Sequence, residues 1–244
     1  MAISTKIVTI PPDPSQTVLT NGEIELKGQF TSGNNYTFLV NVCHAGSETL
    51  AVYKPTRGEQ PLWDFPESSL AGREVSAYLV SQALGFGIVP FTLLRDGPLG
   101  PGSLQQYIEH DPNYHYFSFR PAEIQRLRRV VLFDLLINNA DRKGSHILVQ
   151  KRTRKLYLID HGLCFHVEDK LRTVIWNFAG EPIPVDLLAE LDSLHANRDL
   201  ATLLAPYLRP EEVEALVQRA GVLLAAGQFP FPPEDRRAFP FPPV

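Results

Sequence analysis

The spacing of the apolar residues changes early in the chain, and this change constrains the fold more than any other feature. Before it, residues 23–30, 36–42 and 49–54 alternate apolar with polar side chains or are rich in β-branched and aromatic ones, which is typical of strands. After it, residues 70–84 carry apolar side chains at helical spacing, and Gly85 is a common helix stop. We therefore expect an antiparallel three-stranded meander followed by a helix.

Further strands and helices complete this pattern in the rest of the chain. The expected elements are strands at 89–94 and 104–108, one long helix from 121 to about 139, a strand pair at 147–149 and 156–159, and two or three helices within 185–226. Strands are concentrated before residue 110 and helices after it. The sequence thus predicts an α+β fold with a β-rich lobe, residues 23–110, and a helical lobe, residues 111–228.

The two ends of the chain are rich in proline. Residues 1–22 are polar and contain three prolines, so an extended arm is expected there. Residues 229–244 hold the sequence Phe-Pro-Phe-Pro-Pro twice, at 229–233 and 239–243. Because proline lacks an amide donor and fixes φ, this tail is expected to be neither helix nor inner strand. Its phenylalanines are expected to pack on the domain or to bind an aromatic groove of a partner.

Composition excludes several classes of protein. The 244 residues carry 23 Lys and Arg against 27 Asp and Glu, and the net charge of −4 argues against a dedicated nucleic-acid-binding protein. The two cysteines are too few for a disulfide framework, which is typical of a reducing compartment. No apolar run is long enough to span a bilayer, and no signal peptide is recognised. These features predict a cytoplasmic protein without a transmembrane segment.

Four ionisable residues lie where strands and helices end. Lys54 closes a strand, Glu74 lies on the next helix, Asp141 follows the long helix, and Asp160 ends the later hairpin. ATP phosphates need a cation to position them, and that cation needs an anion to hold it in place. Mg²⁺ requires hard oxygen ligands, and an acceptor hydroxyl needs a carboxylate to take its proton. The combination is typical of kinase phosphoryl transfer.

Five ordered blocks of sequence carry a resemblance to a known family. They are residues 52–55, 73–78, 84–90, 141–142 and 159–165. Together they resemble the phosphatidylinositol 3- and 4-kinase-like family, and most closely the type II phosphatidylinositol 4-kinases and their bacterial relatives. The resemblance extends over about residues 28–205. It implies a two-lobed protein-kinase-like fold with ATP between the lobes.

The resemblance also implies a role for each ionisable residue. Lys54 would bind the α- and β-phosphates of ATP, and Glu74 would pair with Lys54. Asp141 would orient or deprotonate the acceptor hydroxyl. Asp160 would hold Mg²⁺.

Two further segments are implied to bind the nucleotide. The turn that contains Gly33, Asn34 and Asn35 would cover the phosphates through backbone amides. The segment Gln106, Tyr107, Ile108 and Glu109 falls where kinases place the hinge, whose backbone hydrogen-bonds adenine.

His146 departs from the family pattern, in which asparagine lies five residues after the catalytic aspartate. Imidazole is a softer ligand than an amide oxygen and suits Mn²⁺ better than Mg²⁺. Either a second metal ion is weakly held or the preferred ion is not magnesium. Arg142 and Lys143, beside Asp141, are candidates to balance the charge of the transferred phosphate.

The acceptor is not specified by the sequence. Within residues 166–184, Lys170 and Arg172 are outnumbered by acidic residues, whereas a phosphoinositide-binding surface predicts an excess of positive charge. A protein side chain, a small-molecule hydroxyl and an inositol lipid all remain open. The prediction is an ATP-dependent phosphotransferase that uses Mg²⁺ or Mn²⁺.

Two alternatives remain open at this point. One is a catalytically silent kinase fold that binds a nucleotide or a partner. The other is a metal-dependent phosphohydrolase, whose candidate ligands would be Asp141, His146, Asp160, His161 and His166. The hydrolase hypothesis leaves Lys54 and Glu74 without a role.

Overall fold

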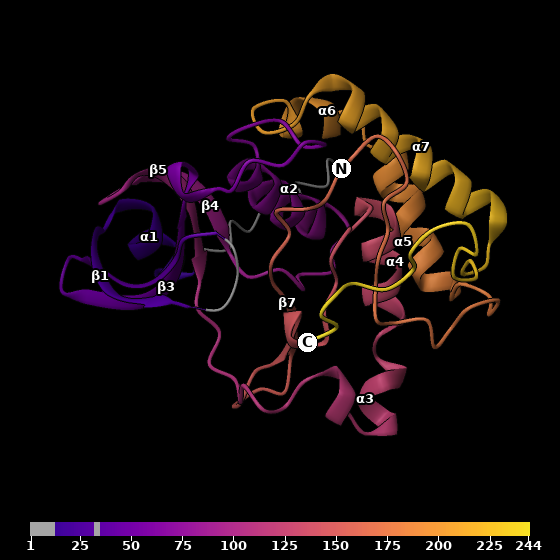
Figure 1. The fold of residues 1–244 in the computed structure, drawn as a ribbon, viewed down its shortest axis with the longest axis horizontal. Coiled ribbons are helices and arrows are strands. Elements are labelled where there is room, and N and C mark those ends of the chain that lie inside the picture. The colour runs from indigo at the N-terminus through magenta and orange to yellow at the C-terminus, as the bar shows by residue number, and fades with distance from the viewer. Residues whose placement is uncertain (1–12, 32–34) are drawn as a thin grey trace, which may run out of the picture.

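The computed structural model describes residues 13–31 and 35–244. One five-stranded sheet dominates the first part of the chain and lies to one side of the helices α3–α7 (Figure 1). Its strands are β1 (Glu23–Phe30), β2 (Thr37–His44), β3 (Ser47–Pro55), β4 (Thr92–Gly97) and β5 (Gly100–Gln106). They lie in the order β1-β2-β3-β5-β4, and each neighbouring pair is antiparallel. The predicted meander of the first three strands is confirmed.

The helix α1 (Pro14–Asn21) replaces part of the expected extended arm. Pro14 occupies the first helical turn, where its missing amide donor has no cost. The Asp13 side chain caps the helix, because its Oδ1 accepts from the Ser15 amide at 2.9 Å. Val18 and Leu19 are buried against the sheet. The extended-arm prediction is therefore wrong for residues 14–21, and residues 1–12 lie outside the described residues.

The second half of the chain is mainly helical. Its elements are α3 (Pro121–Gln125), α4 (Arg128–Ile137), β6 (Ile147–Val149), β7 (Leu156–Leu158), α5 (Val185–His195), α6 (Leu200–Leu204) and α7 (Pro210–Ala226), with short 3₁₀ turns at Thr56–Gly58, Tyr116–Ser118 and Gly144–His146. The single helix expected from residue 121 is instead two helices. The chain turns at Leu127, whose amide bonds Ile124 O, and this turn buries the Leu127 side chain completely.

Helix α2 (Leu70–Ala83) follows the first three strands in sequence but packs into the core of the helical lobe. Its residues Ala77 and Val80 are fully buried in the apolar cluster formed by α4, α5 and α7. A smaller cluster under the sheet contains Val40 and Tyr53. Because α2 is anchored to the helical lobe, its polar face is held at the boundary between the two lobes.

The proline-rich tail runs along the helical lobe, as the yellow end of the chain in Figure 1 shows. Phe229 is fully buried beside Phe178, with ring centroids 6.2 Å apart. Phe231, Phe239 and Phe241 remain exposed. Packing on the domain therefore accounts for one of the four rings, and a partner groove for the others stays a prediction.

Among the described residues, no helix is both long enough and apolar enough to cross a bilayer.

Candidate active site

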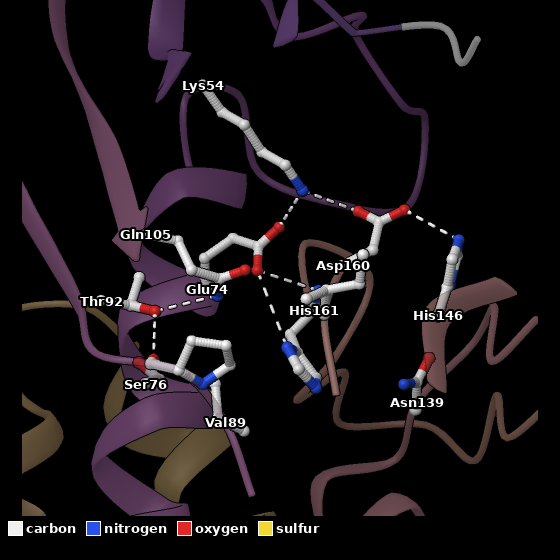
Figure 2. Close-up of polar contacts among 12 residues, drawn as sticks. Lys54, Glu74, Ser76, Val89, Thr92, Gln105, Asn139, His146, Asp160 and His161 are labelled. Carbon is white, nitrogen blue, oxygen red and sulfur yellow. Dashed lines mark hydrogen bonds and ion pairs between the residues drawn. The ribbon is translucent and has the colours of Figure 1, made fainter. Parts of the chain in front are cut away.

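Lys54 joins two carboxylates that are far apart in sequence. It lies near the end of β3, and its Nζ forms ion pairs with Glu74 of α2 and with Asp160 Oδ1, the latter at 2.8 Å. Figure 2 shows the Lys54 ammonium between the two acidic side chains. The site therefore brings together three of the residues predicted from the sequence.

The charges at this junction stabilise one another. Burial disfavours the Lys54 ammonium, but the charges of Asp160 and Glu74 outweigh it and raise the pKa of Lys54 above its ordinary value. Burial likewise disfavours the Glu74 carboxylate, yet Lys54 lowers the pKa of Glu74 to about 2. Lys54 also holds the pKa of Asp160 well below its usual range. All three groups are charged at neutral pH.

Local backbone geometry fixes these side chains. Lys54 lies opposite Ser103 of β5, and the neighbouring Gly102 lets β5 approach closely, since a Cβ there would collide with Lys54 O. Asp160 follows β7 with φ of 62°, in the left-handed region that few residues other than glycine adopt. Strained backbone of this kind persists where the surrounding structure holds it, and it is common at functional sites.

His161 connects the Asp160 loop to α2. Its backbone amide donates to Glu74 Oε2 at 3.0 Å, so the loop and the helix share one carboxylate. The imidazole ring is fully buried, and burial lowers the pKa of His161, which keeps the ring neutral. Its Nε2 lies 3.0 Å from Arg142 Nη2 and accepts the hydrogen bond in that neutral form. His161 is thus a local hydrogen-bonding partner.

Arg142 does not face the site, and its predicted role in balancing phosphate charge is wrong. The side chain is completely buried, and its guanidinium makes two hydrogen bonds of 2.9 Å to the two oxygens of Asp134. It also donates to Ile159 O at 2.9 Å, next to Asp160. Arg142 therefore braces the loops that carry Asp141 and Asp160. Nothing in the sequence indicated that Asp134, within α4, would face inward to pair with it.

Asp141 lies in the loop that follows α4. Its backbone amide donates to Asn139 Oδ1 at 2.9 Å, and its Oδ2 lies 3.3 Å from Lys143 Nζ. The side chain is 26% exposed, so solvent reaches the carboxylate. Burial raises the pKa of Asp141 although Lys143 opposes the shift, and the nearby charge of Asp160 adds to the rise. A carboxylate with a raised pKa and access to solvent is suited to accept a proton.

His146 faces Asp160 from the other side. Its Nε2 lies 3.3 Å from Asp160 Oδ2 (Figure 2), and among the described residues its buried Nδ1 has no hydrogen-bond partner. Burial lowers the pKa of His146 to about 4, so the imidazole is neutral at pH 7. A neutral imidazole is the form that ligates metals. The His146 imidazole and the adjacent Asp160 carboxylate are therefore suitable ligands for a divalent cation.

The described residues contain no group of three or more His, Cys, Asp or Glu side chains arranged to hold a metal ion. Asp160 and His146 alone do not suit a metal ion whose ligands are all protein side chains. Mg²⁺ and Mn²⁺ at phosphate sites take one or two protein ligands and complete their coordination with phosphate oxygens and water. Asp160, with His146 beside it, fits a cation of that kind.

The neutral state of His146 predicts acid sensitivity of the fold. Because burial lowers its pKa from 6.5 to about 4, the folded protein binds fewer protons than the unfolded chain between these values. The stabilisation is therefore complete above pH 6.5 and is lost as the pH falls toward 4. We expect the His146 imidazole to lower the free energy of unfolding by about 2 kcal/mol when the pH falls from 7.5 to 5.

Urea unfolding of His146→Gln in EDTA measures this contribution. The variant is expected to lose most of that pH dependence, whereas His195→Gln, at the exposed end of α5, should keep it. Equal pH dependence in wild type and His146→Gln would contradict the assignment.

A cavity of about 340 Å³ lies beside Lys54, between the sheet and the loops of the helical lobe. Lys54 and four other predicted nucleotide-binding residues line it, namely Asn35, Gln106, Tyr107 and Ile108. Glu109 does not line it, and Gly33 and Asn34 lie outside the described residues. The cavity therefore reaches from the predicted hinge to the predicted metal site.

Apolar side chains from both lobes form the walls of this cavity. They include Val52 of β3, two residues before Lys54, Leu70 and Ala71 of α2, and Leu148 and Ile159 of the hairpin region. None of these residues was assigned a role from the sequence. The period of two along β3 could have identified Val52, because it places Val52 on the same face of the strand as Lys54.

Two backbone groups of the predicted hinge already form hydrogen bonds within the protein. The Tyr107 amide donates to Leu50 O at 3.1 Å, and His110 Nδ1 lies 2.7 Å from Ile108 O. These bonds fix the path of the segment along the cavity. Adenine recognition at this segment stays a prediction.

The family model for phosphatidylinositol 3- and 4-kinase matches residues 73–203, more than half of the chain. The chain belongs to this family. The family predicted from the sequence is thereby confirmed, and the matched range contains Glu74, Asp141 and Asp160. Membership places the protein among the kinase-like proteins.

Curated relatives of this family member are bacterial and plant proteins. The chain is 40% identical to Protein Rv2133c of Mycobacterium tuberculosis, over 94% of this chain and 95% of that protein. It is 30% identical to phosphatidylinositol 4-kinase gamma 4 of rice, over 54% of this chain and 27% of that protein. It is 27% identical to phosphatidylinositol 4-kinase gamma 2 of Arabidopsis thaliana, over 64% of this chain and 35% of that protein. The chain thus spans only a minor part of each plant kinase.

Solved structures share the fold at low sequence identity. The Helicobacter pylori proinflammatory kinase CtkA has a TM-score of 0.54 and 12% identity, covering 85% of this chain and 93% of that one. The Fam20 protein of hydra, solved with a sugar, has a TM-score of 0.55 and 13% identity, covering 92% and 91%. These likenesses confirm the predicted kinase-like α+β fold.

Proposed function

We propose that the protein is an ATP-dependent phosphotransferase that moves the γ-phosphate of ATP to a hydroxyl group. The observation that carries this proposal is the position of Lys54, whose ammonium joins Glu74 and Asp160 beside the cavity. In kinase chemistry a lysine held by a helix glutamate positions the phosphates, and an aspartate holds the metal. Family membership supports this assignment.

The nucleotide would lie in the cavity with its base near the hinge. Val52, Leu148 and Ile159 offer apolar contact to a flat ring, and Lys54 would contact the α- and β-phosphates. Asp160 and His146 would hold Mg²⁺ or Mn²⁺, which neutralises phosphate charge when bound. Glu74 keeps Lys54 directed toward the phosphates.

Asp141 would act on the acceptor. The acceptor oxygen forms its bond to the γ-phosphorus while the bond from that phosphorus to the ADP oxygen breaks, and the hydroxyl proton passes to the Asp141 carboxylate. The raised pKa of Asp141 favours this proton transfer. Lys143, 3.3 Å from the same carboxylate, keeps Asp141 ionised before the reaction.

The acceptor class needs a direct test. The plant relatives are named as phosphatidylinositol 4-kinases, so phosphatidylinositol is one acceptor to examine. Within residues 166–184, however, Lys170 is already paired with Asp64 at 2.9 Å and with Glu168 at 3.5 Å. These ion pairs lower the positive charge available to a lipid headgroup. A small-molecule hydroxyl and a protein side chain are the other acceptors to compare.

Thermal melting with nucleotide tests the proposal. ATP with Mg²⁺ or Mn²⁺ is expected to raise the melting temperature, because a ligand at about 100 times its Kd stabilises the folded state by about 2.7 kcal/mol. The Lys54→Met variant is expected to lose most of this shift, whereas Lys27→Met, at an exposed position on β1, should keep it. Release or transfer of labelled γ-phosphate then measures turnover.

Two other results would point elsewhere. A nucleotide-dependent shift without any γ-phosphate turnover would favour a silent nucleotide-binding protein. A shift produced by the metal ion alone, with no effect of ATP, would contradict the kinase proposal and favour a phosphohydrolase.

A further inference from the structure

Residues 234–243, here called the strap, are attached to the helical lobe along a line that leads to the predicted catalytic loop. At one end, Arg236 Nη1 donates to Leu171 O at 2.8 Å, and Arg236 Nη2 lies 2.5 Å from Asp169 Oδ2. The next residue, Arg237, contacts only a ring of the strap itself among the interactions of the described residues, with Phe241 5.2 Å away. Arg236 is thus the side chain that ties the strap to the lobe.

The middle of the strap continues this attachment. Ala238 is buried, and its carbonyl accepts from the Thr173 amide at 3.1 Å and from Trp176 Nε1 at 3.3 Å. Thr173 itself pairs with Arg142, the residue after Asp141, in an isolated parallel bridge. The strap therefore contacts the segment around Thr173, and this segment in turn contacts the loop that carries Asp141.

The far end of the strap bonds the catalytic loop itself. Pro243 O accepts from the Gly144 amide at 2.8 Å, and Gly144 lies three residues after Asp141. Gly144 also packs closely on Phe117, since a Cβ at Gly144 would lie 3.0 Å from that ring. In the view of Figure 1, the end of the chain is drawn near β7. Gly144, in the loop after Asp141, is thus in contact with both the strap and the Phe117 ring.

Asp141 lies outside the cavity that is proposed for the nucleotide. Asp160 and His146 line that cavity and Asp141 does not, so an acceptor has to reach Asp141 from outside the cavity. The strap borders the loop on which Asp141 lies. An extended polypeptide of six residues spans about 20 Å. To bind beside Asp141 it would have to occupy the surface that the strap already covers. A small hydroxyl compound, or water, has no such requirement.

We infer that the strap limits the size of the acceptor, so that Asp141 is reached by hydroxyl groups on small molecules and not by extended polypeptides. This inference rests on the proposed function and specifies the acceptor class for the same site. It gives the proline-rich repeat a role, because prolines leave the strap without the amides that would bind it into a sheet and keep its carbonyls available to Thr173 and Gly144.

Two variants open the strap in different ways. Arg236→Ala removes the side-chain attachment, and Arg237→Ala is its matched control, since it makes the same change at the neighbouring position. A chain that ends after Pro233 removes the whole strap but keeps Phe229 in the core. Hydrogen exchange at the Gly144 and Thr173 amides reports opening directly, because both amides donate to the strap.

Labelled γ-phosphate is followed to two acceptors: water, by ATP hydrolysis, and dephosphorylated casein, as a polypeptide. We expect both strap-opening variants to label casein about tenfold faster than wild type, which corresponds to a shift of about 1.4 kcal/mol in strap closure. Hydrolysis should change by less than about twofold, because water reaches Asp141 in either state. Arg237→Ala should behave as wild type. The exchange rates of the Gly144 and Thr173 amides should rise together with casein labelling.

Three results would overturn the inference. Wild type could label casein as fast as the shortened chain, the shortened chain could show no gain, or Arg237→Ala could gain as much as Arg236→Ala. In each of these cases ATP would still raise the melting temperature, so the proposed function would survive. The absence of any nucleotide effect in every variant would instead overturn the proposed function and this role of the strap with it.

Discussion

Replacing Asp160 with asparagine is expected to lower the rate of γ-phosphate transfer by roughly 1,000-fold, the size of effect seen when one well-placed electrostatic group is removed from an active site. Asp160 is the anionic side chain that meets both Lys54 and His146. Without it the cation loses its anionic ligand: the neutral His146 imidazole supplies a donor atom but no negative charge, and the Lys54 ammonium repels the cation. The metal-dependent part of nucleotide binding should be lost with the activity.

The fold is expected to survive this substitution. The Asp160 side chain is 47% exposed, and ion pairs at exposed positions contribute about 0–1 kcal/mol. Asparagine also tolerates the left-handed backbone found at Asp160, where φ is 62°. Lys54 keeps its pairing with Glu74. The melting temperature without ligands should therefore stay close to that of wild type.

Single-turnover transfer from labelled ATP, with Mg²⁺ and with Mn²⁺, measures the effect. Asp192→Asn is a matched control, because it makes the same chemical change at an exposed position on α5. Binding of ATP in EDTA should remain within about threefold of wild type, because Lys54 stays available to the phosphates. An Asp160→Asn protein that keeps more than a tenth of the wild-type rate would exclude the assigned role.

Local pattern was sufficient to predict the elements that carry these residues. The alternation at period two located the first three strands, and helical spacing located α2 to within one residue of its observed end. The positions of Lys54 near a strand end, Glu74 on a helix and Asp160 after a hairpin then implied one junction through the family resemblance. The three side chains come together only because α2 packs between the sheet and the helical lobe. That packing was expected from the family resemblance and not from the local pattern.

Contacts between distant parts of the chain were not predictable in this way. Arg142 looked like a candidate for phosphate charge because it follows Asp141, yet it turns inward to Asp134. The helix expected from residue 121 is interrupted at Leu127, whose side chain is fully buried in the core of the helical lobe. Periodicity describes which face of an element is apolar, but it does not identify the partner of a buried charge.

Arg73 is the clearest example of a buried charge that the sequence left unexplained. It precedes Glu74 on α2, is fully buried, and donates from Nη1 to Cys164 O and from Nη2 to Glu212 of α7. Its guanidinium also lies 4.8 Å from the Phe65 ring. One side chain thus ties the helix that carries Glu74 to the loop that carries Asp160 and to the helical lobe.

Arg73→Met is expected to destabilise the protein by about 3 kcal/mol, because it removes the nearest partner of the buried Glu212 carboxylate and leaves only the longer ion pair with Arg209. Urea unfolding measures the loss, and Arg198→Met, at an exposed position, is the matched control. Glu212 retains a hydrogen bond from the Arg209 amide at 2.9 Å and an ion pair with Arg209 Nη2 at 3.5 Å. The Arg209 side chain is half exposed, so these contacts replace the buried ion pair only in part, and a loss below about 1 kcal/mol would contradict a structurally required pair.

The double variant Arg73→Met with Glu212→Gln separates stability from positioning. The glutamine side chain introduced in place of Glu212 carries no charge and can still accept from the Arg209 amide, so at least half of the lost free energy should return. The bond from α2 to Cys164 O stays missing, and Glu74 therefore remains less firmly placed against Lys54. We expect kcat to stay about tenfold below wild type at a temperature where the double variant is fully folded, with the KM for ATP changed less. Recovery of kcat in step with stability would show that Arg73 supports only the fold.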